Sequence, residues 1–335
     1  MDDLALDSAA FQWREALDAA NDSLDTVSRS RQALRFSTAE LGTRVTQLRH
    51  ERDMTERDLE RLAGTTHTHL HRHMHGPSAC GARLGLGAVV EGCVLELDGV
   101  LTPSTGLHAT AWQETFDEFL ARHHQHASGR FEPWRPFDSR GDYFRYLHGR
   151  PRIDGVHRFL DSRGIRLPNG DPSEAPSHET AWGVAARKNQ VLQRFLRQDG
   201  IRAYEGAIRF LELAREAHLG LAIVSASANA AEILDRAGLF GLVDYVVDGH
   251  AMSVERMRPK PEPDSILAAC RRLGIAPGAV ATFETTAAGI AAGRAAGVDR
   301  VMVVDLGAAS LITAAASTAD RVVSELSELI DPDLT

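Results

Sequence analysis

The stretch that decides the fold reads GCVLELDGVLTPSTGLHATAW and covers residues 92–112. It begins with a short apolar run typical of a buried strand, and that run leads to two acidic residues, Glu96 and Asp98, which Gly99 follows. Side chains two positions apart in an extended chain point the same way, and doubly wound parallel sheets bind ligands at the carboxyl ends of their strands. The stretch therefore predicts an acidic site suited to a divalent cation and to phosphate.

Length and composition indicate a globular protein. The chain has 335 residues, enough for roughly two domains, and it is 43% apolar and 25% charged, which allows a sizeable buried core. Its net charge of −9 argues against a general nucleic-acid surface. No stretch approaches the ~20 apolar residues of a membrane span, and the acidic N-terminus is unlike a signal peptide. Because Cys80, Cys93 and Cys270 show no metal or disulfide spacing, we expect a cytoplasmic protein.

From residue 88 onward, strand-like and helix-like segments alternate. Strands are predicted at residues 88–97, 221–225, 243–247, 280–284 and 301–304, and helices at residues 229–237, 264–273 and 286–296. Repeated strand–helix units imply a parallel sheet with helices on both faces. Residues 105–201 interrupt the alternation with a helical pattern. We therefore predict an α/β protein with a Rossmann-like parallel sheet core over residues 88–104 and 202–335 and an inserted α-helical cap over residues 105–201.

Residues 1–87 differ from the rest of the chain. Residues 1–64 are charged, lack proline and carry apolar residues at three- and four-residue spacing, which predicts a helical or coiled-coil extension. A helical hairpin packed on the main domain and a coiled coil that makes a homo-oligomer or binds a protein partner both fit this pattern. Residues 65–87 are interpreted as a linker in which histidines alternate from His67 to His75. In an extended chain these imidazoles would line one side and suit a metal such as zinc, but the flanking glycines and proline favour the linker.

The quoted stretch resembles a known family. Residues 95–100 read Leu-Glu-Leu-Asp-Gly-Val and resemble the first motif of haloacid dehalogenase-like (HAD) phosphatases and mutases, in particular the β-phosphoglucomutase branch, where it usually reads Asp-x-Asp-Gly-Val. The resemblance covers about residues 88–325 and implies the HAD fold with its cap. In the family the first Asp is the nucleophile that becomes an aspartyl phosphate, and the second is the general acid/base. Asp98 matches the second, whereas Glu96 stands at the nucleophile position.

Two further motifs supply candidate phosphate ligands. Ser225 ends a predicted strand just before a helix, where a hydroxyl and exposed backbone amides suit phosphate. It resembles the second motif, whose Ser or Thr binds the phosphoryl group, and Asn229 joins the candidates from the same segment; both residues also fit helix caps without a ligand. Lys260 lies in Arg-Pro-Lys-Pro-Glu-Pro-Asp, residues 258–264, which resembles the third motif. The Lys of that motif neutralises the nucleophile and the phosphate.

The fourth motif departs from the family pattern. Residues 282–289 read Thr-Phe-Glu-Thr-Thr-Ala-Ala-Gly, where the family usually has Glu-Asp before a run of small residues and Gly. Glu284 matches a magnesium ligand, but Thr285 replaces the Asp that supplies another. The resemblance implies a Mg²⁺ site at Glu96, Asp98 and Glu284. Its affinity is expected to be weakened, because Mg²⁺ prefers carboxylate oxygens and a neutral hydroxyl brings no charge.

The predicted cap retains more of the family pattern. His108 matches a residue of the linker between core and cap. The segment His-Gly-Arg-Pro-Arg at residues 148–152 resembles the cap loop whose Arg binds the far phosphate of a sugar bisphosphate, which assigns that role to Arg152. Lys188 and Asn189 match a cap tripeptide that contacts substrate. Taken singly, each of these side chains is more often a solvated helix residue.

Turnover depends on Glu96 and Thr285. The carboxylate of Glu lies one methylene, about 1.5 Å, farther out than that of Asp, and a misplacement of about 1 Å can cost on the order of 10²-fold in rate. The first hypothesis is a pseudoenzyme that retains a phosphate- or phosphosugar-binding pocket and assembles through its helical N-terminus. The second is an active Mg²⁺-dependent sugar-phosphate phosphatase or phosphoglucomutase with Glu96 as nucleophile. The third is a purely structural scaffold.

Overall fold

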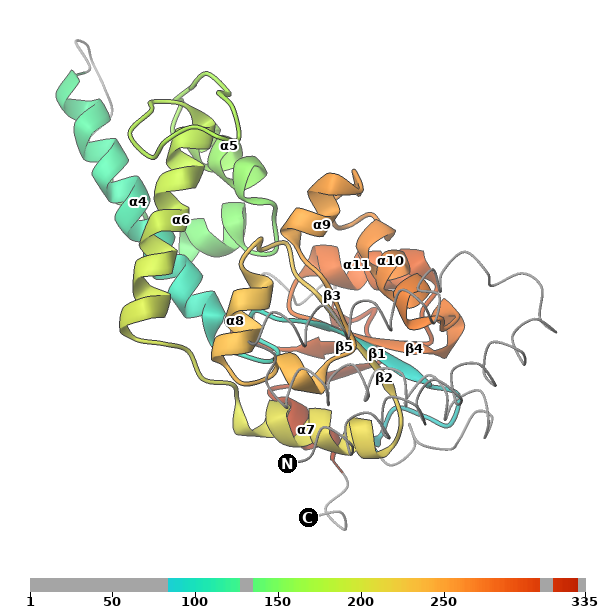
Figure 1. Ribbon diagram of the computed structural model, residues 1–335. Helices are drawn as coiled ribbons and strands as arrows, with labels where there is room; N and C mark the ends of the chain where they lie inside the picture. The colour runs from blue at the N-terminus through green and yellow to red at the C-terminus, as the bar shows by residue number, and fades with distance from the viewer. Residues whose placement is uncertain (1–83, 127–134, 308–315, 331–335) are drawn as a thin grey trace, which may run out of the picture. The chain divides into compact units, whose positions relative to one another are not determined.

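The computed structural model describes residues 84–126, 135–307 and 316–330. The predictions for residues 1–64 and for the histidine tract lie outside the described residues. The described chain forms a six-stranded parallel sheet in the order β3-β2-β1-β4-β5-β6 (Figure 1), which confirms the predicted α/β fold class. The strands are β1 (Gly92–Glu96), β2 (Gly220–Val224), β3 (Tyr245–Val247), β4 (Val280–Glu284), β5 (Arg300–Val304) and β6 (Arg321–Val323).

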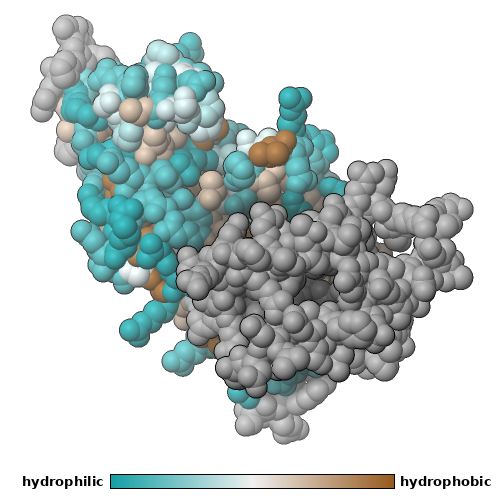
Figure 2. Space-filling view, viewed as in Figure 1, coloured by the Kyte–Doolittle hydropathy of each residue, from teal (hydrophilic) through white to brown (hydrophobic). Residues whose placement is uncertain are grey.

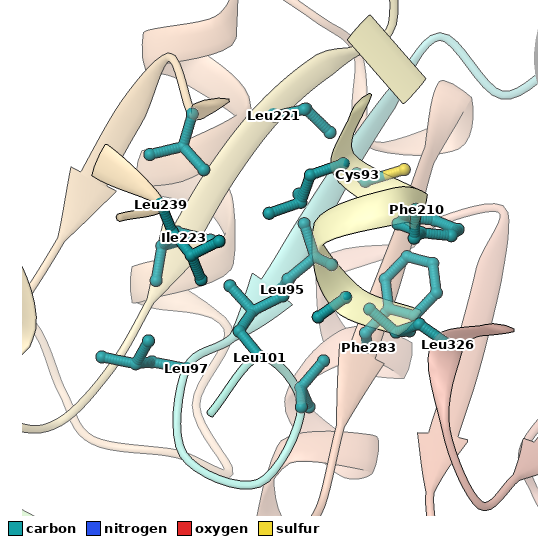
Figure 3. Packing of buried hydrophobic residues seen from close by; sticks show 14 of the residues in the cluster. Cys93, Leu95, Leu97, Leu101, Phe210, Leu221, Ile223, Leu239, Phe283 and Leu326 are labelled. Atoms are coloured by element: carbon teal, nitrogen blue, oxygen red, sulfur yellow. The ribbon is translucent and has the colours of Figure 1, made fainter. Parts of the chain in front are cut away.

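Alternate residues of each strand pack on opposite faces of the sheet. In the central strand β1, Cys93 and Leu95 belong to the apolar core on one face, and Val94 belongs to the core on the other. Figure 3 shows the first core, where the rings of Phe210 and Phe283 meet edge to face with centroids 5.3 Å apart. Burial on both faces explains why β1 is an unbroken apolar run up to Glu96. The first face is covered by α7 (Glu205–Glu216) and α8 (Ala230–Arg236), and the second by α10 (Asp264–Leu273) and α11 (Ala287–Ala296).

A helical insertion separates β1 from α7. Figure 1 shows its helices α4, α5 and α6 grouped together. The insertion has an apolar core of its own, in which the Phe116 ring lies 4.9 Å from that of Trp112 and 4.1 Å from that of Phe159, centroid to centroid. The limits 105–201 for a cap domain stay a prediction. The elements of the insertion are α4 (Ser104–His126), the π-helix η2 (Tyr143–Leu147), α5 (Arg152–Ser162) and α6 (Ala181–Gln198).

The structure differs from the sequence prediction at short elements. β1 begins at Gly92 rather than at residue 88, and the strand β6 and the helix α9 (Gly249–Val254) have no counterpart in the predicted pattern. α9 has six residues, none of them buried, and β6 has three, of which only Val323 is buried. Neither element is long enough to show apolar periodicity. Short 3₁₀ turns complete the chain at η3 (Phe240–Leu242), η4 (Pro277–Ala279) and η5 (Leu326–Leu329).

The surface of the described residues is mainly polar. Figure 2 shows a hydrophilic face with small, separate hydrophobic spots. The large apolar side chains exposed among the described residues are Val89, Val254 and Val322, which lie far apart in the sequence. None of the helices in the described ranges has both the length and the apolar character that crossing a bilayer requires. The residues with candidate chemistry lie instead at the carboxyl end of the sheet.

Candidate active site

The carboxyl end of the sheet brings two of the predicted acidic residues together. Glu96 is the last residue of β1, and Glu284 is the last residue of the neighbouring strand β4. Alternation along the strands places these carboxylates on the face to which Val94 and Val280 belong. Both are deeply buried, with Glu96 5% exposed and Glu284 0% exposed. Buried carboxylates require partners, and each of these two has a different one.

Glu96 is held by Thr285. The backbone N–H and the hydroxyl of Thr285 both donate to Glu96 Oε2, at 2.9 and 2.6 Å. The Thr285 Oγ1 in turn lies 3.1 Å from Nε2 of His148, which belongs to the helical insertion. Burial raises the pKa of Glu96, but the charges of Lys260 and His148 and the bonds from Thr285 lower that pKa more, so the net shift is downward. These donors keep Glu96 an ionised carboxylate.

Glu284 is paired with Lys260. The Lys260 ammonium lies 2.5 Å from Glu284 Oε2, whereas Glu284 Oε1 is buried without a hydrogen-bond partner. Burial raises the pKa of Glu284 to about 7, against the effect of Lys260 and with that of Glu96. Burial lowers the pKa of Lys260, but the charges of Glu284 and Glu96 raise it overall. One ammonium therefore compensates two buried carboxylates.

Asp98 has a separate set of partners. The Ser104 hydroxyl donates to its Oδ1, and the Ser225 hydroxyl donates to its Oδ2 at 3.4 Å. Burial raises the pKa of Asp98 to about 6, with the bond from Ser104 opposing and the charge of Glu96 adding to the shift. A carboxyl group with this pKa can release and accept a proton near neutral pH. Asp98 therefore suits general acid–base chemistry.

A chain of two residues from the insertion ends at Asp98. The Lys188 Nζ lies 2.6 Å from His108 Nδ1, and His108 Nε2 lies 3.5 Å from Asp98 Oδ1. Because Lys188 donates to Nδ1, the imidazole carries its proton on Nε2, which faces Asp98. Burial lowers the pKa of His108 well below its usual value, and the charges of Lys188 and Arg152 lower it further. His108 is therefore neutral, and its Nε2 faces the Asp98 carboxyl group without making a hydrogen bond.

A pocket of about 50 Å³ lies between the core and the insertion. This volume is far below the roughly 300–1,000 Å³ of ordinary small-molecule pockets. The described core and insertion thus leave only a small space between them at this point. The lining includes the predicted residues Glu96, Asp98, His108, Arg152 and Lys188, and also Trp112, Tyr143, His148, Arg150 and Ser227.

The other predicted residues lie around this pocket rather than on its lining. Ser225, Lys260 and Glu284 contact Asp98 or one another behind it. Asn229 Nδ2 donates to Asn189 Oδ1 at 2.9 Å, which joins α6 of the insertion to the start of α8. The structure thus brings the first, second and third motifs and the insertion to one place. The catalytic and binding roles assigned to these residues stay predictions.

The sequence reasoning assigned no role to three residues that the structure places here. Ser104 follows the first motif and bonds Asp98, and Tyr143 lies with its hydroxyl 3.4 Å from His148 Nδ1. His148 is the first residue of the segment 148–152, in which the family resemblance assigns a role to Arg152 alone. Its partner Thr285 is 137 residues away in the sequence. No local pattern relates positions so far apart.

As arranged, these residues do not fit a bound Mg²⁺. The Lys260 ammonium occupies Glu284 Oε2, and Thr285 occupies Glu96 Oε2. Within residues 84–126, 135–307 and 316–330, no three His, Cys, Asp or Glu side chains gather as a metal site. Among these carboxylates, the buried Oε1 of Glu284 has no hydrogen-bond partner, which favours a cation. A divalent ion therefore requires these carboxylates to rearrange.

The sheet, the order of the motifs at the strand ends and the helical insertion define a class of protein. Residues 90–297 match the haloacid dehalogenase-like hydrolase family, and the chain belongs to that family. Within it, the chain is similar to the β-phosphoglucomutases of Mycobacterium bovis and Mycobacterium tuberculosis. The identity to each is 41% over 251 residues, which is 74% of this chain and 94% of the relative. These matches confirm the predicted family and its β-phosphoglucomutase-like branch.

Solved structures share the fold. A β-phosphoglucomutase from Clostridium difficile has a TM-score of 0.55 and 20% identity, over 73% of this chain and 95% of that one. CbbY from Rhodobacter sphaeroides, in complex with xylulose 1,5-bisphosphate, has a TM-score of 0.54 and 21% identity, over 72% of this chain and 99% of that one. At these identities the likeness shows the fold alone.

Proposed function

We propose that this chain is a β-phosphoglucomutase-related protein that binds a phosphosugar and is impaired in phosphoryl transfer. The observation that carries the proposal is the bonding of Glu96, whose Oε2 accepts hydrogen bonds from both the backbone N–H and the hydroxyl of Thr285. Thr285 is the residue that replaces a family carboxylate. Phosphoryl transfer depends mainly on positioning and on positive charge at the phosphate. A longer attacking side chain and a lost anionic neighbour alter both together.

The charges around the pocket support phosphosugar binding. Arg150, Arg152 and Lys188 line it, together with the carboxylates Glu96 and Asp98. One nitrogen of the Arg152 guanidinium, Nη1, lies 3.4 Å from the Ala185 carbonyl oxygen. The remaining N–H groups of the guanidinium suit a bidentate contact with a phosphate. The relatives at 41% identity point the same way, since their name, β-phosphoglucomutase, denotes a glucose phosphate as substrate.

Binding and turnover, measured on one preparation, test the proposal. Calorimetric titration with glucose phosphates gives affinity, and assays of isomerisation and hydrolysis give rate. We expect saturable binding, with turnover on the order of 10²-fold or more below that of ordinary enzymes. Failure to bind any glucose phosphate contradicts the binding half of the proposal. Turnover at an ordinary enzymic rate contradicts the impairment.

The second candidate is an active Mg²⁺-dependent sugar-phosphate phosphatase or phosphoglucomutase. The arrangement of Asp98, His108 and Lys188 favours it, because that arrangement holds a carboxyl group with a pKa of about 6 beside an imidazole donor. In such an enzyme the Glu96 carboxylate attacks phosphorus, and Asp98 gives a proton to the leaving oxygen and removes one from the next acceptor.

For the cofactor, we propose that Mg²⁺ binding is weakened rather than abolished. Thr285→Asp restores an anionic neighbour beside Glu284, and we expect it to tighten Mg²⁺ binding by about tenfold or more. Calorimetric titration of both proteins with MgCl₂ measures the difference. Unchanged affinity contradicts the role given to Thr285 in metal binding.

Assembly through residues 1–64 is the remaining part of the proposal, and it also bears on the scaffold hypothesis. Sedimentation of the whole chain is compared with that of a chain that starts at Gly85. A larger mass per particle for the whole chain, beyond the added residues, supports helix-driven assembly, and equal monomeric states contradict it. A cytoplasmic location likewise stays a prediction from the cysteine spacing.

A further inference from the structure

A chain of hydrogen bonds runs from the helical insertion to Glu96. His148 follows η2, Thr285 follows β4, and Glu96 ends β1. The His148 Nε2 lies 3.1 Å from Thr285 Oγ1, which lies 2.6 Å from Glu96 Oε2. Thr285 is 1% exposed, so little water competes for these bonds. The hydrogen bonds thus join the insertion to the ends of two strands of the sheet.

The direction of these bonds follows from the chemistry of the groups. An ionised Glu96 only accepts, so the Thr285 hydroxyl donates to it. The Thr285 oxygen then accepts from His148, which places the imidazole proton on Nε2. The His148 Nδ1 remains an acceptor, and the Tyr143 hydroxyl lies 3.4 Å from it. Every donor of the chain therefore points toward Glu96.

We propose that Thr285 and His148 are positioning residues of this site. Thr285 holds the Glu96 carboxylate directly, and His148 holds it from the insertion through Thr285. An Asp at position 285 would place a second carboxylate against Glu96 Oε2, where like charges repel, whereas Thr donates two hydrogen bonds to the same oxygen. The Glu at position 96 and the Thr at position 285 are thus matched to each other.

This inference rests on the proposed function in that it treats the pocket beside Glu96 as a phosphate site. Inorganic phosphate is the probe, titrated calorimetrically into the full chain at one pH. Thr285→Val keeps the branched shape without the hydroxyl and weakens phosphate binding by about tenfold, because Glu96 loses a donor and turns its charge toward the ligand. Thr285→Ser keeps the hydroxyl and stays within about twofold of the unchanged chain.

The contribution of His148 is tested in two backgrounds. His148→Leu weakens phosphate binding by about threefold in the unchanged chain and has no further effect in Thr285→Val, because it acts through that hydroxyl. His157→Leu is the matched control. His157 lies in α5 of the same insertion, and its ring bonds Asn169 at 2.9 Å at an exposed position. The variant His157→Leu is expected to leave phosphate affinity unchanged.

Two results overturn the proposal: equal losses in Thr285→Ser and Thr285→Val, and additive losses for His148→Leu and Thr285→Val. A chain that binds no phosphate at all contradicts the proposed function instead. The same variants are then compared by urea unfolding, which needs no ligand. The positioning chain predicts that the effects of Thr285→Val and His148→Leu on the unfolding midpoint are non-additive, and additive effects overturn it.

Discussion

The two carboxylates of the first motif are two residues apart, yet their surroundings differ. Asp98 has hydroxyl donors and the chain of His108 and Lys188, and its pKa is raised to about 6 by burial. Glu96 is tied to Thr285, and despite its burial its pKa is lowered by the charges and donors around it. The residue types around Asp98, the predicted acid/base, are thus those that the family resemblance implies. At Glu96, the predicted nucleophile position, and at Thr285 they are not.

This contrast shows that the two functions of such a site can change separately. Ser104, Ser225 and the pair His108–Lys188 surround Asp98, whereas Glu96 is bonded by Thr285, which follows β4. Changes at the strand ends alter the predicted nucleophile position and the predicted metal ligands together, because Glu96 and Glu284 end neighbouring strands and Thr285 bonds Glu96. The same changes leave the donors of Asp98 in place.

The largest expected effect comes from restoring the altered side. Glu96→Asp combined with Thr285→Asp shortens the attacking side chain and returns an anionic neighbour, so hexose-phosphate turnover in the presence of Mg²⁺ rises on the order of 10²-fold or more. Steady-state assays of isomerisation and hydrolysis measure it. Adding Asp98→Asn to the double variant serves as the control and removes the gain. No gain from the double variant shows that these two positions do not limit turnover.

The next largest effect is on stability. Lys260→Met leaves the buried carboxylates Glu284 and Glu96 without their ammonium and lowers the free energy of unfolding by about 3–5 kcal/mol. Urea unfolding measures the loss. Adding Glu284→Gln to the Lys260→Met variant is expected to recover part of it. Arg258→Met is the matched control in the same loop. Arg258 is 63% exposed, so water screens its ion pairs and the expected loss is much smaller. Equal losses for the two Met variants contradict the pairing described here.

Asp98 gives the protein a pH dependence. Folding raises the pKa of Asp98 from 3.8 to about 6, so its contribution to stability is fully present below about pH 4 and is lost as the pH rises through about 6. Two pKa units correspond to roughly 3 kcal/mol. Urea unfolding across this range compares the unchanged chain with Asp98→Asn, in which this part of the slope is missing. An identical slope in both proteins contradicts the raised pKa.

The smallest effect separates the two arginines of the pocket. Arg152→Ala weakens binding of a sugar bisphosphate by about tenfold and leaves inorganic phosphate almost unaffected, because its predicted role is at the far phosphate. Arg150→Ala is the control, since Arg150 already pairs with Asp154 at 3.5 Å, and the expected loss is smaller. Calorimetric titration of both variants with both ligands measures the loss of affinity. Equal losses for the two variants contradict the role of Arg152.

The sheet was predictable from the sequence because its strands are short apolar runs buried on both faces, as β1 and β4 show. β6 and α9 were not, because three and six residues carry too little pattern. Glu96 and Asp98 were predictable as a pair because the motif is local. The bond from His148 to Thr285 was not, because it joins the insertion to a strand end 137 residues away in the sequence. The bond between Asn189 and Asn229 has the same origin.

The proposal that the protein binds a phosphosugar but transfers its phosphoryl group poorly is tested directly by whether residue 96 becomes phosphorylated. Intact-mass and peptide mass spectrometry follow the full chain after it is mixed with Mg²⁺ and a sugar bisphosphate that donates a phosphoryl group. We predict that Glu96 stays unmodified in the unchanged chain, and that the double variant Glu96→Asp with Thr285→Asp is phosphorylated there under the same conditions. A stoichiometric acyl phosphate on Glu96, formed as fast as an ordinary enzyme turns over, would contradict this prediction.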